Sequence, residues 1–275
     1  MKFRLLKASE YSSYSEQLKQ FEAQFNYPLG EQTFQINHGT ADGNYFAFFQ
    51  SLGKENVFIL EHKGRLLGVG CAILRKVTRE ETQSFWYLCD FKLDQSVRGK
   101  NILTYLLMRY LIPFYCKSKN LVVINMSSPK NNWLVKKINS TLFFLRLKIK
   151  PLYFYEWTND EYGEVLNMIP DAFSDMALYT NYGNKDIIIG NEVRPVIHIV
   201  NKDHASINLP LHNTVNIDKA LFKEATNQPV FMLASSNKLK NCVINQHEIT
   251  PSYIGTMILS KAINGENLRF SSLEI

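Results

Sequence analysis

The stretch QSFWYLCDFKLDQSVRGKNILTYLLMRYLIPFY, residues 83–115, joins three predicted elements without a gap. Residues 83–93 are rich in aromatic and apolar side chains, a composition typical of a strand. Residues 94–100 supply Asp, Ser and Gly, which favour a turn. Apolar residues then recur at helical spacing up to Pro113, where we expect the helix to end. The stretch therefore predicts a strand, a basic turn and a helix in succession.

The predicted turn has the chemistry of an anion site. Arg98 and Lys100 flank Gly99, and the first N–H groups of the following helix have no partner inside the helix. The positive end of the helix attracts phosphate, and glycine lets the backbone approach a ligand closely. The sequence thus predicts a phosphate site at the start of this helix. The alternative is an ordinary helix with a basic turn before it.

This turn resembles the pyrophosphate-binding loop of the GNAT superfamily, whose members are acyl-CoA-dependent N-acyltransferases and whose loop reads Gln/Arg-x-x-Gly-x-Gly/Ala. The aligned residues are Arg98, Gly99, Lys100, Asn101, Ile102 and Leu103. Arg98 matches the first position. Asn101 replaces a glycine but tolerates positive φ better than most residues, whereas Leu103 replaces Gly or Ala with a branched side chain. The resemblance implies that acetyl-CoA, or another acyl-CoA, is bound by these six residues.

The order of elements in residues 1–155 resembles the same superfamily. A strand and helices precede a glycine-turn hairpin, and the central strand and helix are followed by strand, helix and strand. We therefore predict an α/β fold of the α+β kind, with a mixed sheet. Residues 1–155 would form a GNAT-like domain, and residues 156–275 a smaller α/β domain that shapes the acceptor site or makes a dimer contact.

The resemblance also implies a bulge in the strand at residues 83–93, where the thioester carbonyl would bind the backbone of Phe91, Lys92 and Leu93. Asp90 is the carboxylate of this strand and is our candidate general base. Strand alternation places its side chain on the face of Trp86, where aromatic surroundings favour uptake of a proton. A structural hydrogen-bonding role for Asp90 is the alternative.

The helix predicted for residues 131–138 carries a second implied contact. Asn132 lies where family members often place an asparagine against the cofactor, although an N-cap role is the alternative. As a whole, the resemblance implies N-acyl transfer to a primary amine. Many family members also carry a general-acid tyrosine in this helix, and this chain has none there. That absence favours the alternative, a non-catalytic GNAT-fold protein that binds a ligand or partner.

Composition narrows the classes of partner. Residues 1–155 carry 22 Lys and Arg against 11 Asp and Glu, whereas residues 156–275 carry 9 against 14. The basic part suits an anionic cofactor, and the acidic part disfavours one continuous nucleic-acid surface. The four cysteines and six histidines show no metal-ligand spacing. No apolar run is long enough to span a membrane, so we expect a cytoplasmic protein, or one exported by a route that this sequence does not show. We expect an amine-bearing small molecule or protein as acceptor, and a homodimer is an open alternative.

Overall fold

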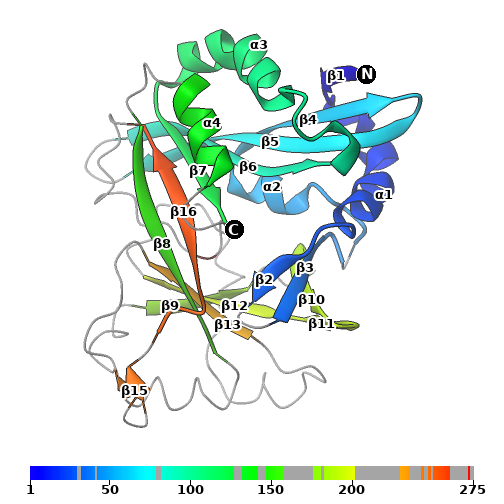
Figure 1. Cartoon of the computed structure of the whole chain (residues 1–275). Coiled ribbons are helices and arrows are strands. Elements are labelled where there is room, and N and C mark those ends of the chain that lie inside the picture. The colour runs from blue at the N-terminus through cyan, green and yellow to red at the C-terminus, as the bar shows by residue number, and fades with distance from the viewer. Residues whose placement is uncertain are drawn as a thin grey trace. The chain divides into compact units, whose positions relative to one another are not determined.

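The structure is a computed structural model of the 275-residue chain (Figure 1). It describes residues 1–29, 32–40, 42–78, 82–126, 132–141, 147–157, 176–180, 183–201, 230–235, 243–244, 247–248, 250–260 and 272. The sequence also predicts a strand at residues 142–147 and a helix at residues 160–169, and both lie almost wholly outside this part. None of the helices in the described ranges has the length and apolar content that a bilayer crossing requires.

Contacts divide the chain into two units that interleave along the sequence. The first comprises residues 1–22, 49–151 and 255–268, and the second comprises residues 23–48, 152–254 and 269–275. The two-domain boundary at residue 155 stays a prediction, because the units describe contacts and not independently folding domains.

The first unit is built on a mixed sheet with the strand order β1-β4-β5-β6-β7-β16. Neighbouring strands are antiparallel except β6 and β7, which are parallel. The strands are β1 (Lys2–Leu5), β4 (Lys54–His62), β5 (Arg65–Thr78), β6 (Thr82–Leu93), β7 (Leu121–Asn125) and β16 (Tyr253–Leu259). The predicted hairpin is β4 and β5, and the predicted central strand is β6, whereas β16 was not foreseen.

Helices cover the two faces of this sheet. They are η1 (Ala8–Glu10), α1 (Tyr11–Glu22), α2 (Ala47–Leu52), η2 (Gln95–Val97), α3 (Ile102–Lys117) and α4 (Trp133–Thr141). Helices α3 and α4 lie on one face, and α1 lies on the other (Figure 1). The prediction that the central helix ends at Pro113 was wrong. The helix continues for another turn, and the N–H of Ser118 closes it on the carbonyl of Phe114.

The core between the sheet and helices α3 and α4 is rich in aromatic side chains. Trp86 stacks on Phe114 with ring centroids 4.2 Å apart, and Phe58 packs on Tyr110 at 4.8 Å. Aliphatic side chains from α4 and β16 complete the same cluster. Burial of these large rings is the main force that holds α3 on the sheet.

The second unit contains two sheets. One has the order β8-β13-β12-β9, in which β12 and β13 are parallel, and the other is antiparallel with the order β11-β10-β3-β2. Its strands are β2 (Tyr27–Leu29), β3 (Gln32–His38), β8 (Lys148–Trp157), β9 (Met176–Thr180), β10 (Lys185–Ile189), β11 (Glu192–Arg194), β12 (Val196–Asn201) and β13 (Val230–Ser235), and a separate pair is β14 (Val243–Ile244) and β15 (His247–Glu248). A parallel pair therefore occurs in each unit.

Candidate functional site

The site begins at an irregularity in β6. Asp90 has φ 56°, a left-handed backbone conformation inside a strand, and the register between β5 and β6 shifts at this point. Opposite it on β5 lies Gly70, where an added Cβ would come within 2.5 Å of the Phe91 ring. Glycine at residue 70 therefore makes room for the bulged strand, as expected where one strand carries an extra residue.

The bulge reverses the predicted orientation of Asp90, so the expectation that it shares a face with Trp86 was wrong. Phe91 instead packs against the cluster of Trp86 and Leu88. Asp90 contacts the ammonium group of Lys92, which reaches Glu22 of α1 on the other side of the sheet. Strand alternation fails here because the extra residue of a bulge inverts every side chain that follows it.

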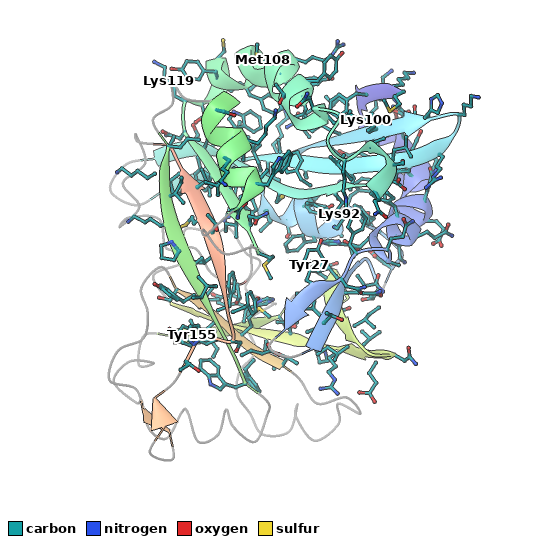
Figure 2. The ribbon with its side chains drawn as sticks, in the orientation of Figure 1. Tyr27, Lys92, Lys100, Met108, Lys119 and Tyr155 are labelled. Atoms are coloured by element: carbon teal, nitrogen blue, oxygen red, sulfur yellow. The ribbon has the colours of Figure 1, made fainter. Side chains whose placement is uncertain are left out.

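Asp90, Lys92 and Glu22 form a buried charged cluster. Lys92 Nζ lies 2.8 Å from Glu22 Oε1 and also donates to Asp90 Oδ1. The three side chains are 6%, 2% and 1% exposed, in that order. Figure 2 labels Lys92 near the end of β6. The prediction for Lys92 concerned its backbone alone, so this role of its side chain was not foreseen.

Pairing between β6 and its parallel neighbour β7 ends just before the bulge. Paired residues run from Trp86 with Leu121 to Leu88 with Val123, whereas β7 continues to Asn125 on its pairing with β16. Backbone groups of β6 after Leu88 are thus no longer paired with β7. An opening of this kind between two parallel strands lets a ligand bond directly to strand backbone.

The turn after β6 is held by its own side chains. Asp94 Oδ1 accepts hydrogen bonds from the N–H of Ser96 at 2.8 Å and from its hydroxyl at 2.6 Å, which lowers the pKa of Asp94. Arg65 adds an ion pair to the same carboxylate at 2.7 Å. Arg98 donates from Nε to the Leu93 carbonyl at 3.1 Å. The turn is therefore fixed against the end of β6.

Two left-handed residues lead from the turn into α3. Gly99 has φ 81°, and Asn101 has φ 54° and ψ 26°, so asparagine does adopt the conformation for which the family uses glycine. The first bond inside the helix runs from Tyr105 N–H to the Asn101 carbonyl. The N–H groups of residues 102–104 precede it and have no partner inside the helix. Lys100 is exposed beside them.

Two further groups at this helix start were not foreseen. Lys137 of α4 donates from Nζ to Asn101 Oδ1 at 2.8 Å, which adds a cation near the positive end of α3. The Thr104 hydroxyl, in the first turn, is buried and makes no hydrogen bond to any described residue. A threonine in the first turn of a helix is too common for the sequence alone to have indicated it.

Asn132 has the N-cap role that the sequence left as an alternative. Its Oδ1 accepts from the Val135 N–H at 3.2 Å, and its Nδ2 donates to Asn125 Oδ1 at 3.0 Å and to Thr256 Oγ1 at 3.3 Å. The residue is buried, so it ties the start of α4 to β7 and β16. Contact between Asn132 and a cofactor stays a prediction.

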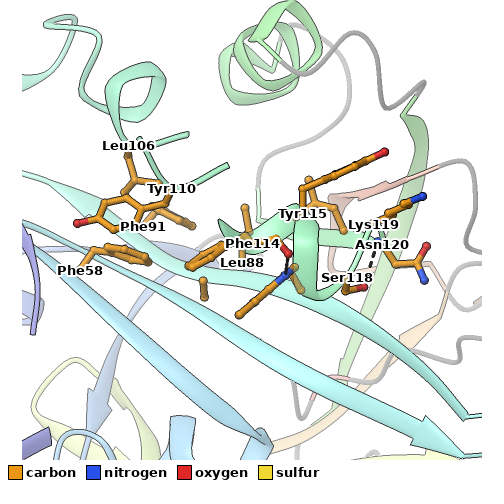
Figure 3. Close-up of a pocket in the computed structure, with 13 residues that line it drawn as sticks. Phe58, Leu88, Phe91, Leu106, Tyr110, Phe114, Tyr115, Ser118, Lys119 and Asn120 are labelled. Atoms are coloured by element: carbon orange, nitrogen blue, oxygen red, sulfur yellow. Dashed lines mark hydrogen bonds between the residues drawn. The ribbon is translucent and has the colours of Figure 1, made fainter. Parts of the chain in front are cut away.

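An apolar pocket lies under α3 beside the bulge (Figure 3). It encloses about 530 Å³ of space, part of which is open to solvent. Polar groups of Ser118, Lys119 and Asn120 stand at one end of it. Its apolar wall includes Phe58, Ala72, Leu88, Phe91 and Leu106. Leu88 and Phe91 therefore belong both to the opening between β6 and β7 and to this pocket.

Comparison with known proteins identifies the fold. No protein-family model matches the chain, and no curated protein sequence does. Among solved structures, a tandem GNAT protein from the clavulanic acid biosynthesis pathway covers 94% of this chain over 97% of its own length, with a TM-score of 0.52 and 9% identity. The chain has a GNAT fold. The likeness extends through most of both units, so the predicted GNAT-like α/β fold is confirmed.

Two other solved acetyltransferase structures match about half of the chain. An acetyltransferase from Trypanosoma brucei is 21% identical over 50% of this chain and 89% of its own, with a TM-score of 0.34. Glucosamine-6-phosphate N-acetyltransferase from Arabidopsis thaliana is 19% identical over 50% and 88%, with a TM-score of 0.33. Both scores lie below 0.5, so the GNAT fold assignment rests on the tandem protein.

Proposed function

We propose that this GNAT-fold protein is an acyl-CoA-dependent N-acyltransferase that moves an acetyl or longer acyl group to a primary amine. The observation that carries the proposal is the bulge at Asp90, where β6 leaves β7 next to the start of α3. A thioester that enters this opening would meet strand backbone, and the phosphates of the same cofactor would lie at the helix start.

The phosphate end of the cofactor would bind residues 98–103. Gly99 and Asn101 turn the backbone so that the first N–H groups of α3 point out of the helix, and Lys100 and Lys137 supply positive charge. The Thr104 hydroxyl is a further donor for a phosphate oxygen. The Nε of Arg98 already donates to the Leu93 carbonyl, so Arg98 would contact a phosphate through its other guanidinium nitrogens.

The reacting end would bind the backbone of Phe91, Lys92 and Leu93. A neutral amine attacks the thioester carbon, and N–H groups at the opening stabilise the oxyanion that forms. Asp90 would then accept a proton from the attacking nitrogen. This transfer suits the step after attack, when the nitrogen is most acidic, and collapse of the oxyanion then breaks the C–S bond and releases CoA as a thiolate.

The apolar pocket favours a donor longer than acetyl. Leu88 and Phe91 of its wall also border the proposed thioester site, and most of its lining side chains are apolar. Each methylene buried there would strengthen binding about fourfold, since a buried methylene contributes about 0.8 kcal/mol. Octanoyl-CoA should therefore bind more tightly than acetyl-CoA, and Ala72→Leu should abolish this difference without weakening acetyl-CoA.

Calorimetric titration with acetyl-CoA, octanoyl-CoA and CoA tests the cofactor assignment. We expect micromolar binding that weakens by about 10- to 150-fold in Lys100→Gln, because a charge-assisted hydrogen bond contributes about 1.5–3 kcal/mol. Lys117→Gln is the matched control, since Lys117 lies in the last turn of the same helix. Absence of binding at millimolar CoA would refute the proposal.

Thiol release with a panel of primary amines then separates an enzyme from a binding protein. Asp90→Asn is the informative variant, because asparagine also tolerates positive φ and so preserves the bulge. We expect Asp90→Asn to lower turnover and leave CoA affinity unchanged. Tight CoA binding without thiol release for any amine would instead support the second candidate, a non-catalytic GNAT-fold protein, which the absence of a tyrosine in residues 131–138 favours.

A further inference from the structure

Two cysteines face each other across the strands that carry the bulge. Cys71 of β5 is paired with Cys89 of β6 in the antiparallel register, immediately before the register shifts. Residues directly opposite each other project from the same face, with Cα atoms about 4.5–5.5 Å apart. Disulfides span Cα separations of about 4.4–6.8 Å, so this pair has the geometry that a cross-strand disulfide requires.

Cys71 and Cys89 are both free cysteines, and each thiol lies in the electrostatic surroundings of the other. Cys71 is buried, and burial raises the pKa of its thiol, with further contributions from Cys89, Asp90 and Glu55. Cys89 is only partly buried, so an oxidant reaches Cys89 first.

We propose that Cys71 and Cys89 form a redox-active pair that closes to a disulfide beside the bulge. With hydrogen peroxide as oxidant, the Cys89 thiolate attacks one oxygen, the O–O bond breaks and a sulfenic acid forms with release of water after protonation. The Cys71 sulfur then attacks the Cys89 sulfur, and the S–O bond breaks with release of a second water. Two thiols lose two electrons in total, and one peroxide becomes two waters.

The disulfide would act on the neighbouring backbone. Cβ atoms in disulfides lie about 3.8 Å apart, closer than the 4.5–5.5 Å of ordinary cross-strand neighbours, so β5 and β6 must approach at this pair. Asp90 follows Cys89 directly and is held at φ 56° opposite Gly70. Oxidation should therefore shift the bulge, whatever chemistry the bulge supports.

Peroxide treatment of the 275-residue protein under native conditions tests the pair. The chain has four cysteines. We expect thiol titration to fall from four to two per molecule, and mass spectrometry of an unreduced digest to show a Cys71–Cys89 linked peptide that dithiothreitol removes. Cys116→Ser should give the same linked peptide, because Cys116 lies on α3 and not on the two strands that carry the pair.

Two variants make the result decisive. Cys71→Ala should leave Cys89 as a sulfenic or sulfinic acid with no linked peptide, and Cys89→Ala should protect Cys71 from peroxide. Thermal unfolding of each variant confirms that it is folded. Oxidation confined to Cys116, or the same Cys89 oxidation products in wild type and Cys71→Ala, would overturn the proposal. Since the readout is the linked peptide, the outcome is independent of the proposed acyl transfer.

Discussion

Replacement of Lys92 with methionine tests the buried charged cluster. Methionine keeps most of the length of the lysine side chain but removes the ammonium group that contacts both Glu22 and Asp90. Two carboxylates would then face each other in a site where all three side chains are less than one-tenth exposed. Breaking a buried ion pair from one side typically costs about 3–5 kcal/mol, so we expect a loss of that size in the free energy of unfolding.

Differential scanning calorimetry at pH 7 measures this loss. At about 2–4 °C per kcal/mol for a protein of this size, the melting temperature should fall by roughly 6–20 °C. Lys100→Met is the control, because that lysine is exposed and its loss should change stability by no more than about 0.5 kcal/mol. The double variant Glu22→Gln with Lys92→Met should recover part of the loss, since one of the two facing charges is gone.

A free energy of unfolding for Lys92→Met within about 1 kcal/mol of the wild-type value would contradict this expectation. Such a result would mean that water reaches the carboxylates, or that the cluster rearranges without strain. A double variant less stable than Lys92→Met would also count against it, because repulsion between the carboxylates would then not be the source of the loss.

Three other substitutions test the residues that hold the bulge, the turn after β6 and the start of α4 in place. Gly70→Ala should cost about 1–3 kcal/mol, because the new Cβ lies 2.5 Å from the Phe91 ring, and Phe91→Leu should relieve part of that cost in a urea-unfolding double-mutant cycle. Asp94→Asn should cost about 1 kcal/mol at pH 7. The pKa of Asp94 is lowered in the fold, first by its hydrogen bond to the Ser96 hydroxyl, so this stabilisation is present above the unfolded pKa of about 3.9. It is lost as pH falls through the lower folded value, and urea midpoints of wild type and variant should therefore converge as the pH is lowered past that value. Asn132→Ala should cost about 1–3 kcal/mol by thermal unfolding, whereas Asn132→Asp should recover part of it by keeping the cap acceptor.

The parts of the fold that local pattern controls were predictable. Aromatic composition located β6, helical spacing located α3, and the tolerance of asparagine for positive φ anticipated the backbone at Asn101. Each of these depends on residues that are neighbours in sequence. Residues 98–103 and the opening after Leu88 stay candidate binding groups, because acyl-CoA binding itself is untested.

The orientations and contacts of the side chains at the site could not be predicted from the sequence. The bulge at Asp90 depends on the register between β5 and β6, and its local signal is Gly70, twenty residues upstream on the other strand. The strand pattern therefore put Asp90 on the wrong face. Lys92 meets Glu22 across 70 positions of sequence, a pairing that only the packing of α1 on the sheet creates.

The place of β16 in the sheet bears on how the chain is synthesised. β7 pairs with β16 from Asn125 opposite Thr256 to Val122 opposite Leu259, and Leu121 and Ser260 exchange hydrogen bonds at the end of this ladder. A ribosome makes β7 about 130 residues before its partner. Until β16 emerges, the nascent first unit keeps an open strand edge, the kind of edge that chaperones cover and that promotes aggregation. The first unit therefore completes its sheet only after residue 259 has been translated, and a gene cut after residue 155 would express it with that edge still open.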